Sequence, residues 1–506
     1  MRNALLALLT LPAVASLAFA QYYPAAGNPY YGQIAAQPIQ RMQYPYGAYN
    51  YAPPFRYPVP PNAYGYNNGY GVNYYYVQNP YANYSPAQQG PAAPAPVTPA
   101  WPEPVQNAPP LPPADDDGGD PEVDPAPMPR GAGISFHRPT CECFWLSAGY
   151  TAMLMRPMHM NGPLATTGSV GDPVPGALGQ PNTRALFGDK SIDFGLFSGI
   201  RAELGVFLDR ENRFSLDVAG FYMFANNQGF FAGSDQNGNT LLSRPYFNVA
   251  DGFFNQYRLA NSQAGLLTGT IAADFKSQIS GLEFNSRLHS YIQDRYHGDL
   301  LAGFRYVRLS ESMVVREQIS PLPGTTIPFA GTAFNNPDFV TNQDNFRTVN
   351  QFVGPQFGAR ISWEERWFTL NGFVKVGVGA TLERTDINGS TSLVSGNGAV
   401  TANGGVLALP SNSGGFNRAV FGVLPEFGFD LGVNVTQNVR VKFGYSLLYW
   451  NHVVRPGSQY DTALNPGQIN SSFFYNNTTG PASPAHRFNE EVFWINSFNL
   501  GMEIHY

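Results

Sequence analysis

Charged residues recur at every second position of several otherwise apolar segments, and they are the side chains that could do chemistry. In 439–449, for example, Arg440 and Lys442 alternate with Val439, Val441 and Phe443. Successive side chains of a β-strand point to opposite faces, so this pattern predicts strands with one charged and one apolar face. Over all the predicted strands, the charged face has the basic residues Arg201, Arg287, Arg305, Arg360, Lys375, Arg440 and Lys442, and the acidic residues Asp193, Glu203, Asp217, Glu283, Glu383, Glu426, Asp430 and Glu503.

The presence of both signs of charge on this face allows two interpretations. If the face lines the lumen of a closed barrel, the charges could shape the field of a pore for small solutes. They could instead pair across strands and fill a narrow lumen, as expected when the strand number is close to eight. The balance of basic and acidic residues argues against strong selectivity for cations or for anions.

Other kinds of chemistry find less support in the sequence. A membrane phospholipase would need a nucleophilic Ser and a His on its lipid-facing side. His289 and Ser290 are neighbours in the chain, so a strand points them to opposite faces, and His505 lies on the charged parity. In 235–239 the glycine comes fourth, whereas a helix-loop-helix calcium loop has it sixth. We therefore predict no catalytic residue, no metal site and no cofactor, and we expect that the protein is not an enzyme.

Cys141 and Cys143 are the two cysteines of the chain. Two ligands are too few for a zinc site, and a disulfide between residues i and i+2 would be strained. A structural cross-link is the preferred interpretation, because exported proteins meet an oxidising compartment.

The first 130 residues differ in composition from the rest of the 506-residue chain. Residues 1–20 combine Arg2, an apolar stretch and the tripeptide Ala18-Phe19-Ala20, which is the pattern of a cleaved signal peptide. More than half of the 44 prolines and of the 29 tyrosines lie in 21–130. This composition predicts a largely unfolded periplasmic linker, or alternatively a segment that contacts the cell wall. A net charge of −6 argues against nucleic acid as the main partner.

Residues 131–506 contain ten predicted strands whose connections alternate between long and short. The strands are 143–155, 192–208, 213–226, 275–292, 296–312, 346–363, 367–385, 419–435, 439–453 and 492–506, and 275–292 mixes its faces. The short turns are 209–212, 293–295, 364–366 and 436–438. Outer-membrane barrels have short periplasmic turns and long outer loops. The predicted fold is an all-β antiparallel transmembrane barrel of about ten strands, or twelve if 227–274 and 391–410 hide a hairpin.

Aromatic residues on the apolar parity predict where the two membrane surfaces lie. Trp363 and Trp367 flank the short turn 364–366, whereas Tyr449 and Trp494 fit the outer surface. The chain ends in Tyr506, with apolar residues at alternate positions before it, and this ending resembles the signal that the barrel-assembly machinery reads. These features predict a protein of the bacterial outer membrane, surrounded by its lipid.

Several segments resemble the putative beta-barrel porin family of bacterial outer membranes, the seventh family of that name. They are Phe144–Tyr150, Gly162–Thr167, Ala185–Gly188, Asp299–Tyr306, Gly444–Trp450 and Val454–Gly457. The resemblance is spread over 143–506 and leaves out the N-terminal tail. It implies an outer-membrane barrel and, through the family's name, a channel for passive diffusion of small solutes. The alternative is a closed structural or adhesive barrel that tethers the envelope through 21–130.

Overall fold

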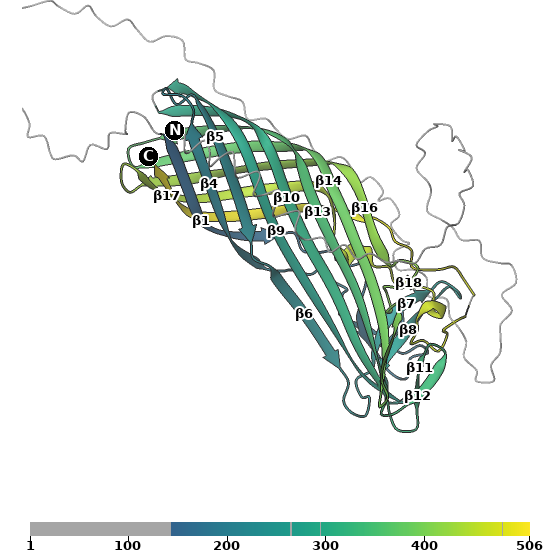
Figure 1. Cartoon of the computed structure of the whole chain (residues 1–506). Coiled ribbons are helices and arrows are strands. Elements are labelled where there is room, and N and C mark those ends of the chain that lie inside the picture. The colour runs from purple at the N-terminus through teal and green to yellow at the C-terminus, as the bar shows by residue number, and fades with distance from the viewer. Residues whose placement is uncertain (1–142, 264–265, 294, 478) are drawn as a thin grey trace, which may run out of the picture. The chain divides into compact units, whose positions relative to one another are not determined.

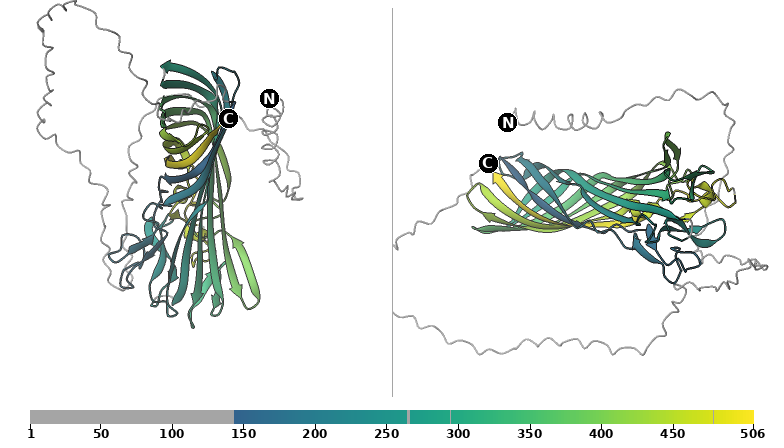
Figure 2. Two further views of the ribbon diagram at one scale, coloured as in Figure 1. Left: turned by 90° about the vertical axis from the view of Figure 1, so that its left-hand side faces the viewer. Right: turned by 90° about the horizontal axis from the view of Figure 1, so that it is seen from below.

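The computed structural model describes residues 143–263, 266–293, 295–477 and 479–506. In these ranges ten antiparallel strands form a ring in the order β10-β13-β14-β16-β17-β19-β1-β4-β5-β9, and the ring closes because β9 also pairs with β10 (Figure 1 and Figure 2). The predicted transmembrane-barrel fold is therefore confirmed. The predicted signal peptide, the linker and Cys141 lie outside the described residues, and Cys143 is exposed just before the first strand.

The strands of the ring differ widely in length. They are β1 (Phe144–Met155), β4 (Leu196–Phe207), β5 (Phe214–Met223), β9 (Leu267–Gln293), β10 (Tyr296–Pro321), β13 (Phe339–Glu364), β14 (Phe368–Ser395), β16 (Gly414–Asn434), β17 (Val439–Val454) and β19 (Glu490–His505). The four short turns lie at the same end of the ring as Trp145 and His505, which pair across the closing β1–β19 seam. Following the topology of outer-membrane barrels, we call this the periplasmic end and the opposite one the outer end.

The outward face of the ring is apolar next to the periplasmic end. Exposed side chains there include Leu146, Tyr150, Leu204, Phe304, Phe357, Leu370, Phe429, Leu500 and Met502. A closed ring pairs the strands' backbone groups with one another, which a sheet in hydrocarbon requires. Trp367, Tyr449 and Tyr506 are exposed on this face, whereas Trp363 and Trp494 are half-buried. Their place at the membrane surfaces stays a prediction.

Four neighbouring strands are much longer than a bilayer requires. β9, β10, β13 and β14 each contain 26 to 28 residues, whereas about 9–11 tilted residues cross a bilayer. In their outer halves the polarity of the two faces is reversed. Outward positions there carry Asp274, Lys276, Arg316, Gln343, Arg347 and Arg384, and inward positions carry Phe275, Ile279, Met313, Val315, Phe346 and Ile387.

This reversal explains why the sequence-based bounds are too short. The predicted strands begin at 275 and 346 and end at 312 and 385, whereas β9 and β13 begin at Leu267 and Phe339 and β10 and β14 end at Pro321 and Ser395. Part-way along each of these strands the apolar residues change from the outward face to the inward face. A prediction that requires apolar residues on one face throughout therefore ends the strand too early.

The long connections build a folded cap at the outer end. β2 (Ala165–Thr167), β3 (Arg184–Phe187), β7 (Leu242–Asn248), β8 (Phe253–Ala260) and β18 (Ala463–Leu464) form a separate sheet, and β11 (Thr326–Phe329) pairs with β12 (Thr332–Asn335). The connection from β17 to β19 carries two short helices, α2 (Pro456–Gln459) and η1 (Pro466–Gln468). Among the described helices, none is long and apolar enough to cross a membrane.

The two regions suspected of hiding extra strands do contain them, but these strands do not widen the ring. β6 (Asn226–Gly233) pairs with the outer half of β9, where it takes over the edge that β5 leaves at Ser280. β15 (Gly398–Asn403) pairs with the outer end of β14, beyond Ile387, where β16 stops pairing. The main sheet thus has twelve strands, and ten of them close the ring.

Candidate functional site

The inward face of the ring next to the periplasmic end is covered by charged side chains, which we call the charged belt. It contains each of the predicted lumen residues, namely Arg201, Glu203, Asp217, Arg305, Arg360, Lys375, Glu426, Asp430, Arg440, Lys442 and Glu503, together with Glu283 and Arg287. Two other predicted positions lie elsewhere. Asp193 is exposed before β4 and accepts a hydrogen bond from the backbone N–H of Gly195. Glu383 points inward but lies farther out, 2.6 Å from Arg418.

A cluster of four charges crosses the lumen in the charged belt. Arg305 of β10 contacts both Glu283 of β9 and Glu426 of β16, although β13 and β14 separate β10 from β16 in the ring. Lys375 Nζ lies 2.9 Å from Glu283 Oε2 and 3.1 Å from Glu426 Oε2. These side chains are almost completely buried, so they fill the centre of the barrel at this level.

Two further groups of ion pairs line the wall on either side of the β1–β19 seam. Arg287 lies 2.8 Å from Glu203 and 2.7 Å from Asp217, and so joins three strands. Arg440 and Lys442 share Glu503 at 3.1 and 2.9 Å. Paired charges of this kind are fixed in place by one another and are poorly available to a passing ion.

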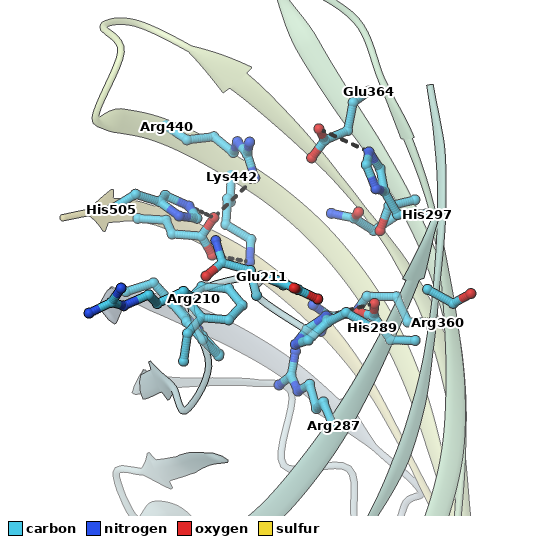
Figure 3. A pocket seen from close by; sticks show the side chains of 18 residues that line it. Arg210, Glu211, Arg287, His289, His297, Arg360, Glu364, Arg440, Lys442 and His505 are labelled. Atoms are coloured by element: carbon cyan, nitrogen blue, oxygen red, sulfur yellow. Dashed lines mark hydrogen bonds and ion pairs between the residues drawn. The ribbon is translucent and has the colours of Figure 1, made fainter. Parts of the chain in front are cut away.

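The charged belt surrounds a cavity of about 450 Å³ that opens at the periplasmic end (Figure 3). Side chains from β9, β10, β13, β17 and β19 point into it, among them Arg287, His289, Arg360 and Lys442. Two smaller cavities, of about 80 and 40 Å³, lie deeper in the lumen and are also lined by Arg360. We call the three cavities together the vestibule.

Directly above the vestibule, the lumen is filled by a layer of buried apolar side chains, which we call the apolar layer. It consists of Met153, Phe197, Met223, Ile279, Val307, Phe352, Leu424, Leu448, Trp450, Phe493 and Ile495, contributed by nine of the ten ring strands. Trp450 and Phe352 are fully buried, and their rings meet edge to face at 6.4 Å. The indole N–H of Trp450 donates to Thr381 Oγ1 of β14 at 2.8 Å. β14, the ring strand that contributes no apolar side chain to the layer, is therefore linked to it by a hydrogen bond.

Glycines make room for the largest rings of the apolar layer. A Cβ atom on Gly377 would lie 3.0 Å from the Phe352 ring, and one on Gly422 would lie 3.1 Å from it. Both distances are shorter than ordinary contacts between carbon atoms. The Phe352 ring therefore packs close to the backbones of β14 and β16, where a side chain at Gly377 or Gly422 would crowd it.

The connection from β17 to β19 enters the barrel above the apolar layer and is anchored by a buried ion pair. Arg455 donates two hydrogen bonds to Glu311 of β10, at 2.8 and 2.7 Å, and both side chains are completely enclosed. Burial alone would lower the pKa of the Arg455 guanidinium, but the attraction of Glu311 outweighs it and the pKa is raised. Arg455 also donates to the Arg156 carbonyl at 2.7 Å. We call this anchored connection the plug, and the family-like segment Val454–Gly457 lies at its start.

A Ser-His-Asp hydrogen-bond chain that the sequence did not predict lies beside the vestibule. His289 Nε2 is 2.7 Å from Ser215 Oγ, and His289 Nδ1 is 2.9 Å from Asp299 Oδ1. This is the order of groups in a catalytic triad. Ser215 is completely buried, however, so its hydroxyl is not presented to the cavity that His289 and Asp299 line. The chain joins β5, β9 and β10 as a structural contact.

The chain matches the family described as putative beta barrel porin-7 over residues 145–506. No curated protein matches the chain.

Solved outer-membrane proteins resemble the chain only distantly. The outer membrane protease OmpT from Escherichia coli is 11% identical, with 74% of this chain and 99% of that one covered at a TM-score of 0.32. The toluene transporter TbuX of Ralstonia pickettii is 9% identical, with coverages of 72% and 90% and a TM-score of 0.18. A FadL homologue of Pseudomonas aeruginosa is 8% identical, with the same coverages and a TM-score of 0.21. At these TM-scores none of the three supports an argument about function.

Proposed function

The chain belongs to the putative beta barrel porin-7 family of outer-membrane barrels, and we propose that it is a closed structural barrel with an adhesive outer cap. This proposal rests on the apolar layer, which fills the lumen with side chains from nine strands. An ion that crossed it would lose its hydration shell without finding polar partners. Hydrophobic constrictions stop ion conduction in channels because they exclude water.

The two ends of the closed barrel suit it to connecting the layers of the envelope. At the outer end the cap exposes aromatic side chains, with Phe231, Phe253 and Phe473 each about 70% exposed. We propose these three side chains as points of contact with material outside the cell. At the periplasmic end the chain that precedes β1 carries the Tyr- and Pro-rich tail of 21–130. We propose that this tail binds cell-wall material while the cap contacts the surroundings of the cell.

The second candidate is a weakly selective diffusion channel for small solutes. The balanced signs in the charged belt and the opening of the vestibule to the periplasm favour it. In this case the apolar layer would have to move aside, and the plug anchored by Arg455 would have to move with it. The proposal includes no enzymatic activity, in keeping with the buried hydroxyl of Ser215.

Conductance in planar bilayers distinguishes the two candidates. We expect the purified, folded wild-type protein to be silent. The double variant F352A/W450A removes the Trp450 indole and the Phe352 ring that meets it, and should give conductance steps when the plug anchored by Arg455 moves aside. The matched control is F357A/W367A, which removes two exposed aromatic rings from the outward face and should stay silent. Regular steps from the wild type would reject the closed barrel.

The tether is tested separately by deleting residues 21–130. The deletion should weaken attachment of the outer membrane to the cell wall, measured as vesicle release, and leave the conductance unchanged. Unchanged vesicle release would reject the tethering role but not the closed lumen.

A further inference from the structure

Arg201 and Arg360 are exceptions in the charged belt. The other five basic side chains of the belt form ion pairs within 3.1 Å of a carboxylate. Neither Arg201 nor Arg360 forms a side-chain hydrogen bond or an ion pair with any residue in the described part of the chain. Glu203 and Asp299 are close enough to Arg360 to interact electrostatically, and so are Glu283 and Glu426 to Arg201, but none of the four carboxylates contacts its arginine. Two guanidinium groups in the belt thus keep their hydrogen-bond donors available.

Both arginines line the vestibule rather than the wall behind it. Arg360 borders all three cavities, and Arg201 borders the two inner ones. The charged residues around the large cavity are five basic ones (Arg210, Arg287, Arg360, Arg440 and Lys442) and four acidic ones (Glu211, Asp299, Glu364 and Glu503), together with His289, His297 and His505 (Figure 3). Basic side chains outnumber acidic ones by one in this lining, and Arg360, unlike Arg287, Arg440 and Lys442, has no carboxylate in contact with it.

The physical cost of these unpaired arginines is reduced if an anion binds beside them. A charge in a narrow protein cavity loses part of its hydration, and an oppositely charged partner restores the loss. The planar guanidinium group binds carboxylate and phosphate groups through two parallel hydrogen bonds, which a spherical ion cannot reproduce. The cavity of about 450 Å³ has room for a small organic anion, since one water molecule occupies about 30 Å³ of the liquid.

We propose that the vestibule is a binding site for a small solute that bears a phosphate or carboxylate group and enters from the periplasmic end. Arg360 is its principal contact, because it borders each of the three cavities, whereas Lys442 and Arg201 each border two of them. The site ends blindly below the apolar layer. The proposal goes beyond the closed barrel and is independent of it, since binding does not require conduction.

Isothermal titration calorimetry on the full-length protein in detergent tests the site with inorganic phosphate and with succinate. We expect saturable binding of at least one of the two, and a second titration with added chloride measures how strongly chloride competes. Arg360→Gln should weaken that binding about tenfold or more, the loss expected for a charge-assisted contact. Arg360→Lys should weaken it less, because it keeps the charge but not the two-pronged geometry. The matched control is Arg347→Gln, which removes an exposed arginine from the outward face of the same strand.

Each outcome decides a definite point. Binding of phosphate alone, of succinate alone or of both supports the site and identifies its preferred oxyanion. The proposal is overturned if neither anion binds, if chloride competes as strongly as either oxyanion, or if Arg347→Gln weakens binding as much as Arg360→Gln. If Arg360→Gln fails to fold, the lysine variant decides, and wild-type affinity in that folded variant overturns the two-pronged contact. A silent planar bilayer is compatible with all of these results, so the two proposals fail separately.

Discussion

The inner and outer halves of β9, β10, β13 and β14 belong to the same strands but have opposite polarity. In the inner half Phe357 of β13 faces outward and is 58% exposed, while Arg305 of β10 faces inward and is buried. In the outer half Arg347 of β13 faces outward, while Phe346 beside it faces inward and is fully buried. The backbone pairing runs through both halves without a break from Tyr296 to Ile319.

The solvent around each half of the barrel, lipid or water, decides which face of the strand is apolar. Lipid around the inner half favours apolar residues outside and leaves the polar ones to pair in the lumen. Water around the outer half reverses the preference, so the same sheet packs an apolar core against the cap, as a soluble protein does. The apolar layer lies where the two arrangements meet, and the lumen closes there.

The largest effect is expected from the buried anchor of the outer half. Arg455→Leu leaves Glu311 as an enclosed, unpaired carboxylate, and should cost about 3–5 kcal/mol of the free energy of unfolding. Urea titration of the protein in lipid vesicles measures this. The control is Arg316→Leu, which breaks the exposed 2.6 Å pair with Asp274 and should cost about 0–1 kcal/mol. Equal losses in the two variants would show that the outer half is not packed as described.

A second prediction concerns the two outward faces directly. Phe357→Arg places a charge in the lipid-facing half of β13 and should cost about 2–4 kcal/mol. Gln343→Arg, at an exposed outward position of the other half, should change the stability by no more than about 0.5 kcal/mol. The same urea titration measures both variants. A large cost at position 343 would mean that lipid extends along the whole strand.

A smaller effect is expected where the two halves meet. Thr381→Val keeps the shape of the side chain but removes the acceptor of the Trp450 indole N–H, which is fully buried. We expect a loss of about 1–3 kcal/mol. Thr341→Val on the outward face of β13 serves as the control and should be nearly neutral. Matching results in the two variants would argue against a rigid apolar layer.

The sequence predicts the inner half of the barrel well because one rule applies there. Alternation of Arg440 and Lys442 with Val439, Val441 and Phe443 identifies both the strand and its lumen face. The ten strands, their order along the chain and the inward position of the charged belt all follow from this alternation. The loop asymmetry identifies the periplasmic end.

The outer half and the vestibule are harder to predict because they depend on distant contacts. The mixed faces of 275–292 are the sign of the polarity reversal, since Phe275 and Ile279 share the parity of Glu283 and Arg287. The partners of Arg455 and of His289 come from other strands, Glu311 at 144 and Ser215 at 74 residues' separation. No local pattern links such residues, and which arginines stay unpaired depends on the whole charged belt.

Cysteine accessibility along the outward face of β13 tests the reversal of polarity most directly. In a background with Cys141 and Cys143 replaced by serine, single cysteines at positions 343, 347, 357 and 361 would be exposed to a membrane-impermeant maleimide in proteoliposomes. We expect rapid labelling at 343 and 347, which face water, and protection at 357 and 361, which face lipid. Rapid labelling at all four positions, or protection at all four, would contradict it.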